Sequence, residues 1–279
     1  MGRFTAKPLP ALALAGMALM LAASPARADT PTPPVAAPGA AIDETQKQAI
    51  EQIVRYYLLA NPEVLRDALI VLGNREKAAA ENQRKQRIEA LRAELERQPG
   101  DPVLGNPDGR ITIVEFFDYQ CGYCKAMKPV MQKILASEKD VRVVMKEFPI
   151  LSEVSTIAAR AALAAQAQGK YVELHDRLMG HRGRLSEEAV FAIAREAGLD
   201  IDRLKTDMQA PSVEEALDRN RRLAERLEIS GTPSFILGET LVPGAVNEEG
   251  LRKLIAASVA GDVPRQPSRP QRSEQPGPA

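Results

Sequence analysis

The stretch "FFDYQCGYCKAMKP", residues 116–129, holds both cysteines of the chain, with two residues between them. It joins an apolar, β-branched and aromatic run at 110–119 to a helical pattern at 121–137. A second run of strand type follows at 141–150. This order predicts two parallel strands connected by a helix. The first cysteine is therefore expected where a buried strand ends and a helix begins.

A Cys-x-x-Cys pair serves as half of a zinc site, as a structural disulfide or as a redox centre. A structural zinc site needs four protein ligands, and the chain offers only His175 and His181 as further soft donors, which we expect to be solvated. A disulfide this short closes a very small loop and removes little entropy from the unfolded chain. The residues therefore favour a redox centre.

The position of the pair indicates how it would react. Unpaired amides and the positive end of the helix dipole favour a thiolate on Cys121. Thiolates are the nucleophiles and the good leaving groups of disulfide exchange. Cys124, one helical turn further on, is placed to attack a mixed disulfide formed at Cys121.

A helical block at about 151–228 separates this unit from the end of the domain. It ends where two short strands, 232–238 and 240–245, are joined by a tight turn, and Asn247 is expected to cap a final helix. The sequence therefore predicts an α/β sheet interrupted by an inserted helical domain. The expected helices of the block are 155–168, 170–179, 186–197 and one opened by a capping box of Ser212 and Glu215.

The ends of the chain differ in composition from its centre. Residues 1–28 have basic residues, an apolar run and small residues before Ala28, which predicts an export signal cleaved after Ala28. Proline-rich segments at 29–41 and 263–279 are expected to be a flexible linker and a disordered tail. The formal net charge of zero argues against a general nucleic-acid or membrane-surface binder.

Residues 42–98 show a helical pattern throughout, with a break at Asn61-Pro62. Apolar residues share one face on each side of this break, and a polar stretch, 73–87, follows them. The apolar face can fold back on the main domain, or it can pack on copies of itself. The polar stretch favours self-association, so we expect a helical oligomerisation stalk that forms a homo-oligomer.

Three segments carry a family resemblance: "VEFFDYQCGYC", "KEFPI" and "GTPSF". Together they resemble the DsbA-like thiol-disulfide oxidoreductases of the bacterial envelope. The resemblance implies a thioredoxin fold over residues 99–262, a periplasmic location and no cofactor beyond a redox-active Cys121–Cys124 disulfide. It implies that Cys121 is the exposed attacking thiol and Cys124 the buried resolving thiol.

The resemblance also implies how a substrate binds. Thr232-Pro233 matches a loop with a cis proline that faces the cysteines and presents its backbone to an incoming peptide. Gly122 and Tyr123, between the cysteines, are expected to contact the substrate as well.

Glu115 and Lys146 stand out as charged residues in apolar strand runs. Buried charges are costly without partners, so we expect the two to pair beneath the active site and to relay a proton for Cys124. Glu115 also matches the family's buried acidic residue. The alternative is that one or both side chains reach solvent at a strand end. Tyr171 and the methionines are expected to be ordinary packing residues.

The dipeptide between the cysteines bears on the redox role. The strongly oxidising family members have Pro-His there, whereas this chain has Gly122-Tyr123, which resembles the pattern of DsbC-type disulfide isomerases. The stalk is similar in layout to that of the trimeric ScsC-type proteins linked to copper tolerance. We therefore expect an oligomeric disulfide isomerase or reductase. Its partners would be unfolded or misfolded exported proteins and a membrane thiol reductant or oxidant.

Two alternatives stay open. The first is a DsbA-like dithiol oxidase, which uses the same cysteines. The second is a periplasmic copper-binding or scaffold protein whose paired sulfurs hold Cu(I), because soft thiolates suit that ion.

Overall fold

The computed structural model describes residues 42–261, which form two units that divide after Arg66. The expected export signal at 1–28, the linker at 29–41 and the tail at 263–279 lie outside the described residues. No helix within 42–261 has both the length and the apolar character needed to cross a membrane.

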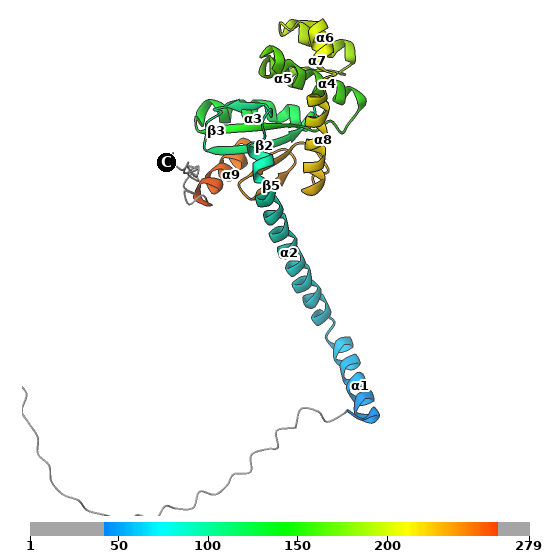
Figure 1. Ribbon diagram of the computed structural model, residues 1–279. Coiled ribbons are helices and arrows are strands. Elements are labelled where there is room, and N and C mark those ends of the chain that lie inside the picture. The colour runs from blue at the N-terminus through cyan, green and yellow to red at the C-terminus, as the bar shows by residue number, and fades with distance from the viewer. Residues whose placement is uncertain (1–41, 262–279) are drawn as a thin grey trace, which may run out of the picture. The chain divides into compact units, whose positions relative to one another are not determined.

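The first unit holds helix α1 (Glu44–Ala60), drawn in blue in Figure 1. Asp43 caps it, accepting a hydrogen bond from the Gln46 amide at 2.8 Å while the Gln46 side chain accepts from the Asp43 amide. The helix ends at Ala60 with Asn61 as its C-cap, and α2 (Glu63–Glu96) starts after Pro62. The break predicted at Asn61-Pro62 is confirmed.

The second unit is built on a five-stranded sheet with the order β1-β3-β2-β4-β5. The parallel β2–β3 pair, joined by α3 (Gly122–Ser137), confirms the predicted strand–helix–strand unit. The other neighbouring strands pair antiparallel. The strands are β1 (Val103–Gly105), which the sequence did not indicate, β2 (Ile111–Phe117), β3 (Val141–Glu147), β4 (Ser234–Leu237) and β5 (Thr240–Pro243).

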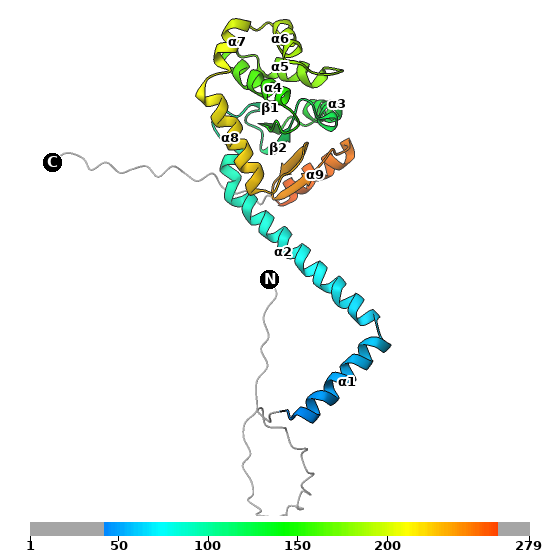
Figure 2. The same cartoon turned by 90° about the vertical axis from the view of Figure 1, so that its right-hand side faces the viewer.

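Helices cover both faces of this sheet (Figures 1 and 2). On one face α3 and α9 (Glu248–Gly261) enclose Ile113 and Leu237. Asn247 begins α9 as predicted, because its side chain accepts a hydrogen bond from the Gly250 amide at 2.8 Å. The opposite face, with Val114 and Ile236, is covered by α8 (Pro211–Arg226) and the end of α2. The structure thus has the thioredoxin architecture.

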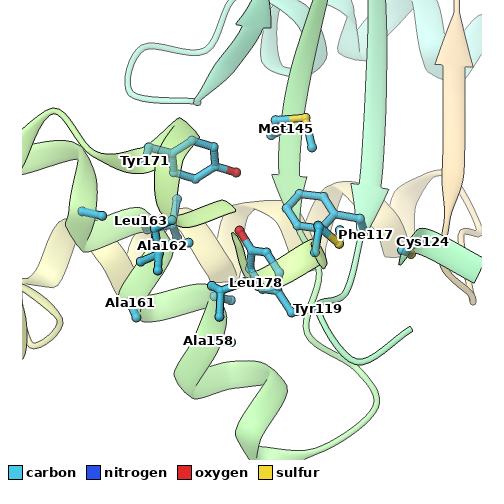
Figure 3. Packing of buried hydrophobic residues seen from close by; sticks show 14 of the residues in the cluster. Phe117, Tyr119, Cys124, Met145, Ala158, Ala161, Ala162, Leu163, Tyr171 and Leu178 are labelled. Carbon is cyan, nitrogen blue, oxygen red and sulfur yellow. The ribbon is translucent and has the colours of Figure 1, made fainter. Parts of the chain in front are cut away.

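The inserted helices lie between β3 and β4. Alanines of α4 pack beside Tyr119, Tyr171 and Leu178, as Figure 3 shows, because small side chains let neighbouring helices approach closely. The insertion comprises α4 (Glu153–Ala164), the 3₁₀ helix η1 (Ala165–Gln168), α5 (Tyr171–Gly180), α6 (Glu187–Glu196), α7 (Ile201–Asp207) and α8 (Pro211–Arg226).

Two details of the insertion differ from the sequence-based expectation. Helix α7 had no expected counterpart, although Asp200 caps it with hydrogen bonds from the amides of Asp202 and Arg203. The capping box of Ser212 and Glu215 is wrong, because α8 already begins at Pro211. Proline lacks an amide hydrogen and suits the first helical position, so it sets this start.

The end of α2 belongs to the core of the second unit. Ile88, Leu91 and Leu95 are each 1% exposed and pack against Val144 and Phe148, among others. The expected boundary between a helical region at 42–98 and a thioredoxin domain at 99–262 is therefore wrong, since the last turns of α2 cover one face of the sheet.

Candidate active site

Cys121 is the N-cap of α3, directly after the turn that follows β2. Its Sγ accepts a hydrogen bond from the Cys124 amide at 3.4 Å, as expected for a thiol at a helix start. The same Sγ donates to the Thr232 carbonyl oxygen at 3.2 Å. The helix start and the Thr232 loop therefore meet at one sulfur atom.

The loop that faces Cys121 contains a cis peptide bond between Thr232 and Pro233, in agreement with the resemblance. Both cysteines are free thiols here. Cys121 is 6% exposed and Cys124 is 1% exposed, so the expectation of an exposed attacking thiol is wrong in degree. The Thr232 carbonyl oxygen contacts the Cys121 sulfur.

Gly122 and Tyr123, the residues between the cysteines, are exposed, whereas both cysteines are buried. Tyr123 is 71% exposed, and a side-chain carbon added at Gly122 would meet nothing within 4 Å. This first turn of α3 is open to a polypeptide that approaches Cys121.

Burial dominates the chemistry of the second cysteine. It raises the pKa of the Cys124 thiol, and the nearby Glu115 carboxyl raises it further. Burial likewise raises the pKa of Glu115 to about 8. Both residues line a cavity of about 380 Å³, so an acid that titrates near neutrality lies next to a thiol that holds its proton.

Lys146 does not pair with Glu115, and that expectation is wrong. In the β2–β3 register Lys146 lies opposite Phe116, whereas Glu115 lies opposite Met145. Side chains alternate between the faces of a sheet, so the two charges lie on opposite faces. Lys146 instead pairs with Asp101 and donates to the Glu94 carbonyl oxygen at 2.8 Å.

A buried polar network beside the site was missed from the sequence. The Glu147 carboxyl accepts hydrogen bonds from the hydroxyls of Tyr119 at 2.9 Å and Tyr171 at 3.0 Å. His175 Nδ1 lies 3.1 Å from the Tyr119 hydroxyl, and its ring stacks on Tyr171. Tyr171 is therefore more than the packing residue that was expected. The one available signal was a glutamate at the end of β3, a strand that is buried along its whole length.

His175 corrects a second expectation, because it is buried and not solvated. Burial lowers the pKa of His175 to about 4 and raises the pKa of Glu147. The imidazole is therefore neutral at pH 7. Nδ1 of His175 shares a hydrogen bond with the Tyr119 hydroxyl, and the tautomer of the imidazole sets which of the two donates.

A known protein family matches the segment of the chain that holds these site residues. A family described as "DSBA-like thioredoxin domain" matches residues 112–256, which include both cysteines and the Thr232 loop. The chain belongs to the DsbA-like thioredoxin family. A second family, "Copper resistance protein ScsC N-terminal domain", matches residues 46–79 in α1 and α2.

Solved structures agree with this assignment. A thioredoxin-like oxidoreductase from Silicibacter pomeroyi is 44% identical, with a TM-score of 0.60, over 61% of this chain and 99% of that one. A periplasmic thioredoxin-like protein from Salmonella enterica serovar Typhimurium is 30% identical, with a TM-score of 0.56, over 61% and 97%. A linker-deletion variant of Proteus mirabilis ScsC is 26% identical, with a TM-score of 0.61, over 79% and 98%.

Curated relatives are longer proteins. Na(+)/H(+) antiporter NhaA 1 of Salinispora arenicola is 30% identical over 185 residues, which are 63% of this chain and 28% of that protein. The chain thus spans less than a third of the length of the curated relatives it matches.

Proposed function

We propose that the chain is an exported thiol-disulfide oxidoreductase that acts on protein disulfides, as an oligomeric isomerase or reductase. One observation carries this proposal: the Cys121 sulfur lies between the amide of Cys124 and the carbonyl of Thr232. It has a helix start to stabilise a thiolate and a backbone edge beside it for a substrate strand. Its redox group is the cysteine pair itself.

The reaction begins when the Cys121 thiolate attacks one sulfur of a substrate disulfide. The substrate S–S bond breaks, a substrate thiolate leaves, and a mixed disulfide with Cys121 forms. In isomerisation another substrate thiolate attacks the bonded substrate sulfur and returns Cys121 as thiolate. In reduction Cys124 attacks Cys121 instead, which leaves a Cys121–Cys124 disulfide and releases the second substrate thiolate.

The second route requires that Cys124 lose its proton. Glu115 is suited to accept it in its ionised form, which at a pKa of about 8 is the minor form at pH 7 and the major form at more alkaline pH. It lines the same cavity as Cys124. Lys146 has no part in this step, because it lies on the other face of the sheet.

Trapping tests the exchange chemistry. Cys124→Ser should accumulate a mixed disulfide with a scrambled multi-disulfide protein, which non-reducing electrophoresis and mass spectrometry detect at Cys121. Cys121→Ser should form none. Absence of any adduct with Cys124→Ser would contradict the proposal.

Refolding of the same scrambled protein separates the possible roles. An isomerase recovers substrate activity when it is supplied reduced, whereas a dithiol oxidase is active on a reduced substrate when it is supplied oxidised. Export, with cleavage after Ala28, is tested by N-terminal sequencing of the protein from a periplasmic extract.

A copper role remains a second candidate, favoured by the match of residues 46–79 to a family named for copper resistance. That segment contains no cysteine, so Cu(I) binding would depend on Cys121 and Cys124. Titration of the reduced protein with Cu(I) against a competing chelator tests it, and Cys121→Ser should abolish binding.

A further inference from the structure

Asp118 is a buried acid in the turn between β2 and Cys121, and the exchange reaction as derived does not use its side chain. It is 1% exposed. Its carboxyl oxygens accept four hydrogen bonds: from the amides of Gln120 at 2.7 Å, Ile150 at 2.9 Å and Leu151 at 3.0 Å, and from the Ser155 hydroxyl at 2.8 Å.

The two oxygens hold different segments. Oδ1 accepts from Gln120 in the cysteine turn and from Ser155 in α4. Oδ2 accepts from the two consecutive amides of Ile150 and Leu151, in the loop that leads from β3 to α4. A single carboxylate thereby joins the turn, the loop and the start of the inserted helices.

The backbone of Asp118 is tied to Cys121 as well. Its carbonyl oxygen accepts a hydrogen bond from the Cys121 amide at 3.1 Å. The 150–151 loop is therefore held in register with the reactive sulfur through one residue.

The loop held in this way exposes apolar side chains. Ile150 is 42% exposed and Leu151 is 53% exposed, although their amides are satisfied by a buried carboxylate. Tyr123 adds a third exposed apolar side chain on the first turn of α3. Single exposed apolar side chains are common, but Ile150 and Leu151 are consecutive and their loop is hydrogen-bonded to the cysteine turn, which suits contact with a bound polypeptide.

We propose that Asp118 is a positioning residue for substrate binding: it fixes Ile150 and Leu151 beside Cys121, where they contact an apolar side chain next to the substrate cysteine. This inference rests on the proposed function and names its substrate class, an extended polypeptide with an apolar residue flanking the cysteine. The sulfur chemistry itself does not depend on the Asp118 side chain.

The experiment compares two peptide disulfides that differ only in leucine or serine beside a cysteine. The reduced enzyme transfers two electrons to the peptide, which becomes a dithiol, and dithiothreitol restores the enzyme and becomes its cyclic disulfide. Wild type should show a lower KM for the leucine peptide. Asp118→Asn, with one acceptor oxygen where the carboxylate has two, should raise that KM about tenfold.

Controls distinguish positioning from sulfur chemistry. The rate at which Cys121 reacts with a small aromatic disulfide should change less than about twofold in Asp118→Asn. Asp140→Asn, which alters an exposed aspartate that also accepts a backbone amide, should leave both KM values unchanged. Ile150→Ser/Leu151→Ser, which changes exposed side chains, should remove the preference for leucine even if Asp118→Asn does not fold.

Equal slowing of the peptide and the small disulfide in Asp118→Asn would overturn the proposal, because the acid would then act on the cysteines. An unchanged leucine preference in the double serine variant would also overturn it. Failure of wild type to react with either compound would instead contradict the proposed function.

Discussion

Burial sets the protonation of the groups beside the reactive sulfur. Cys124 and Glu115 lie in one cavity, and desolvation disfavours the charged form of each. His175 responds in the opposite direction, because its charged form is the protonated one. The site thus holds a thiol, a carboxyl and an imidazole that are all neutral over part of the range near pH 7.

Glu115→Gln should increasingly stabilise the protein relative to wild type as pH rises from 5 to 7.5. The native carboxyl titrates at about 8 and the unfolded one at 4.5, so native Glu115 keeps its proton where the unfolded chain has lost it. Wild-type stability therefore falls as pH rises from 4.5 to 8. The glutamine variant should gain about 3 kcal/mol relative to wild type between pH 5 and pH 7.5. Urea unfolding of the reduced proteins measures this, and an unchanged difference would contradict it.

His175→Phe should show the opposite pH dependence. Native His175 titrates at about 4 and unfolded histidine at 6.5, so wild type loses stability as pH falls from 6.5 towards 4. The contribution is about 2–3 kcal/mol at pH 4.5, and phenylalanine lacks it.

At pH 7 the phenylalanine variant should be less stable than wild type by about 1 kcal/mol, because its ring cannot form the hydrogen bond to Tyr119. This difference in the free energy of unfolding should disappear or change sign at pH 4.5 in the same urea assay. A difference that does not change with pH would contradict the prediction, because native His175 would then take up a proton as readily as the unfolded chain does.

Among the elements, the end of α2 is fixed to the sheet by polar contacts as well as apolar ones. Lys146 donates to the Glu94 carbonyl oxygen at 2.8 Å, and Arg142 donates to that of Glu96 at 2.6 Å. Carbonyls at a helix C-terminus lack intrahelical partners, so two basic side chains from β3 satisfy them. Asp101 balances the charge of Lys146.

Lys146→Met should destabilise the protein without altering the cysteines. Removing one partner of a buried ion pair costs roughly 3–5 kcal/mol, although Arg219 still pairs with Asp101 at 3.0 Å and lowers that cost. We expect a loss near 3 kcal/mol in urea unfolding and faster hydrogen exchange at 94–101. Lys253→Met, in an exposed ion pair, should change stability by less than about 0.5 kcal/mol. An altered alkylation rate of Cys121 in Lys146→Met would contradict this prediction, because Lys146 would then influence the reactive thiol.

Helices and strands with a clear hydrophobic periodicity were predictable from the sequence. The elements against which they pack were not. The parallel strands, the helix start at Cys121 and the break at Asn61-Pro62 follow from local composition. The three-residue β1 carries too little pattern to be recognised. The placement of Lys146 depended on strand register, which fixes the face of the sheet and cannot be read from one strand alone.

The same limit applies to the site. Cys121, Cys124 and the Thr232 loop were identified from motifs that lie within a few residues. The Glu147–Tyr119–His175 contacts join residues 28 and 56 positions apart through the inserted helices, and no local signal reports such packing. Asp118 lay within the quoted motif, but its role depends on a loop 32 residues downstream.

At the scale of the whole molecule, α1 and the start of α2 carry apolar side chains that the single chain leaves exposed. They include Ile53, Leu59 and Leu69, at 68%, 73% and 68% exposure. We propose that further copies of this chain bury them, because apolar side chains this exposed on consecutive helices need a partner surface. Removing residues 42–98 is not a clean test, since Ile88, Leu91 and Leu95 complete the core of the second unit.

Ile53→Asp/Leu69→Asp should therefore convert an oligomer to a monomer while the catalytic unit stays folded. Isomerisation needs a second hold on the substrate while one disulfide opens and another closes, and joined active sites raise its effective concentration. The variant should lose most scrambled-substrate refolding activity yet keep its rate on a small peptide disulfide. Ala79→Asp, on an exposed position of the polar part of α2, should remain oligomeric and active. Light scattering and both assays decide the matter. A monomeric wild type, or a monomeric variant that refolds the scrambled substrate equally well, would favour the dithiol oxidase, because oxidation of a passing dithiol requires only one cysteine pair.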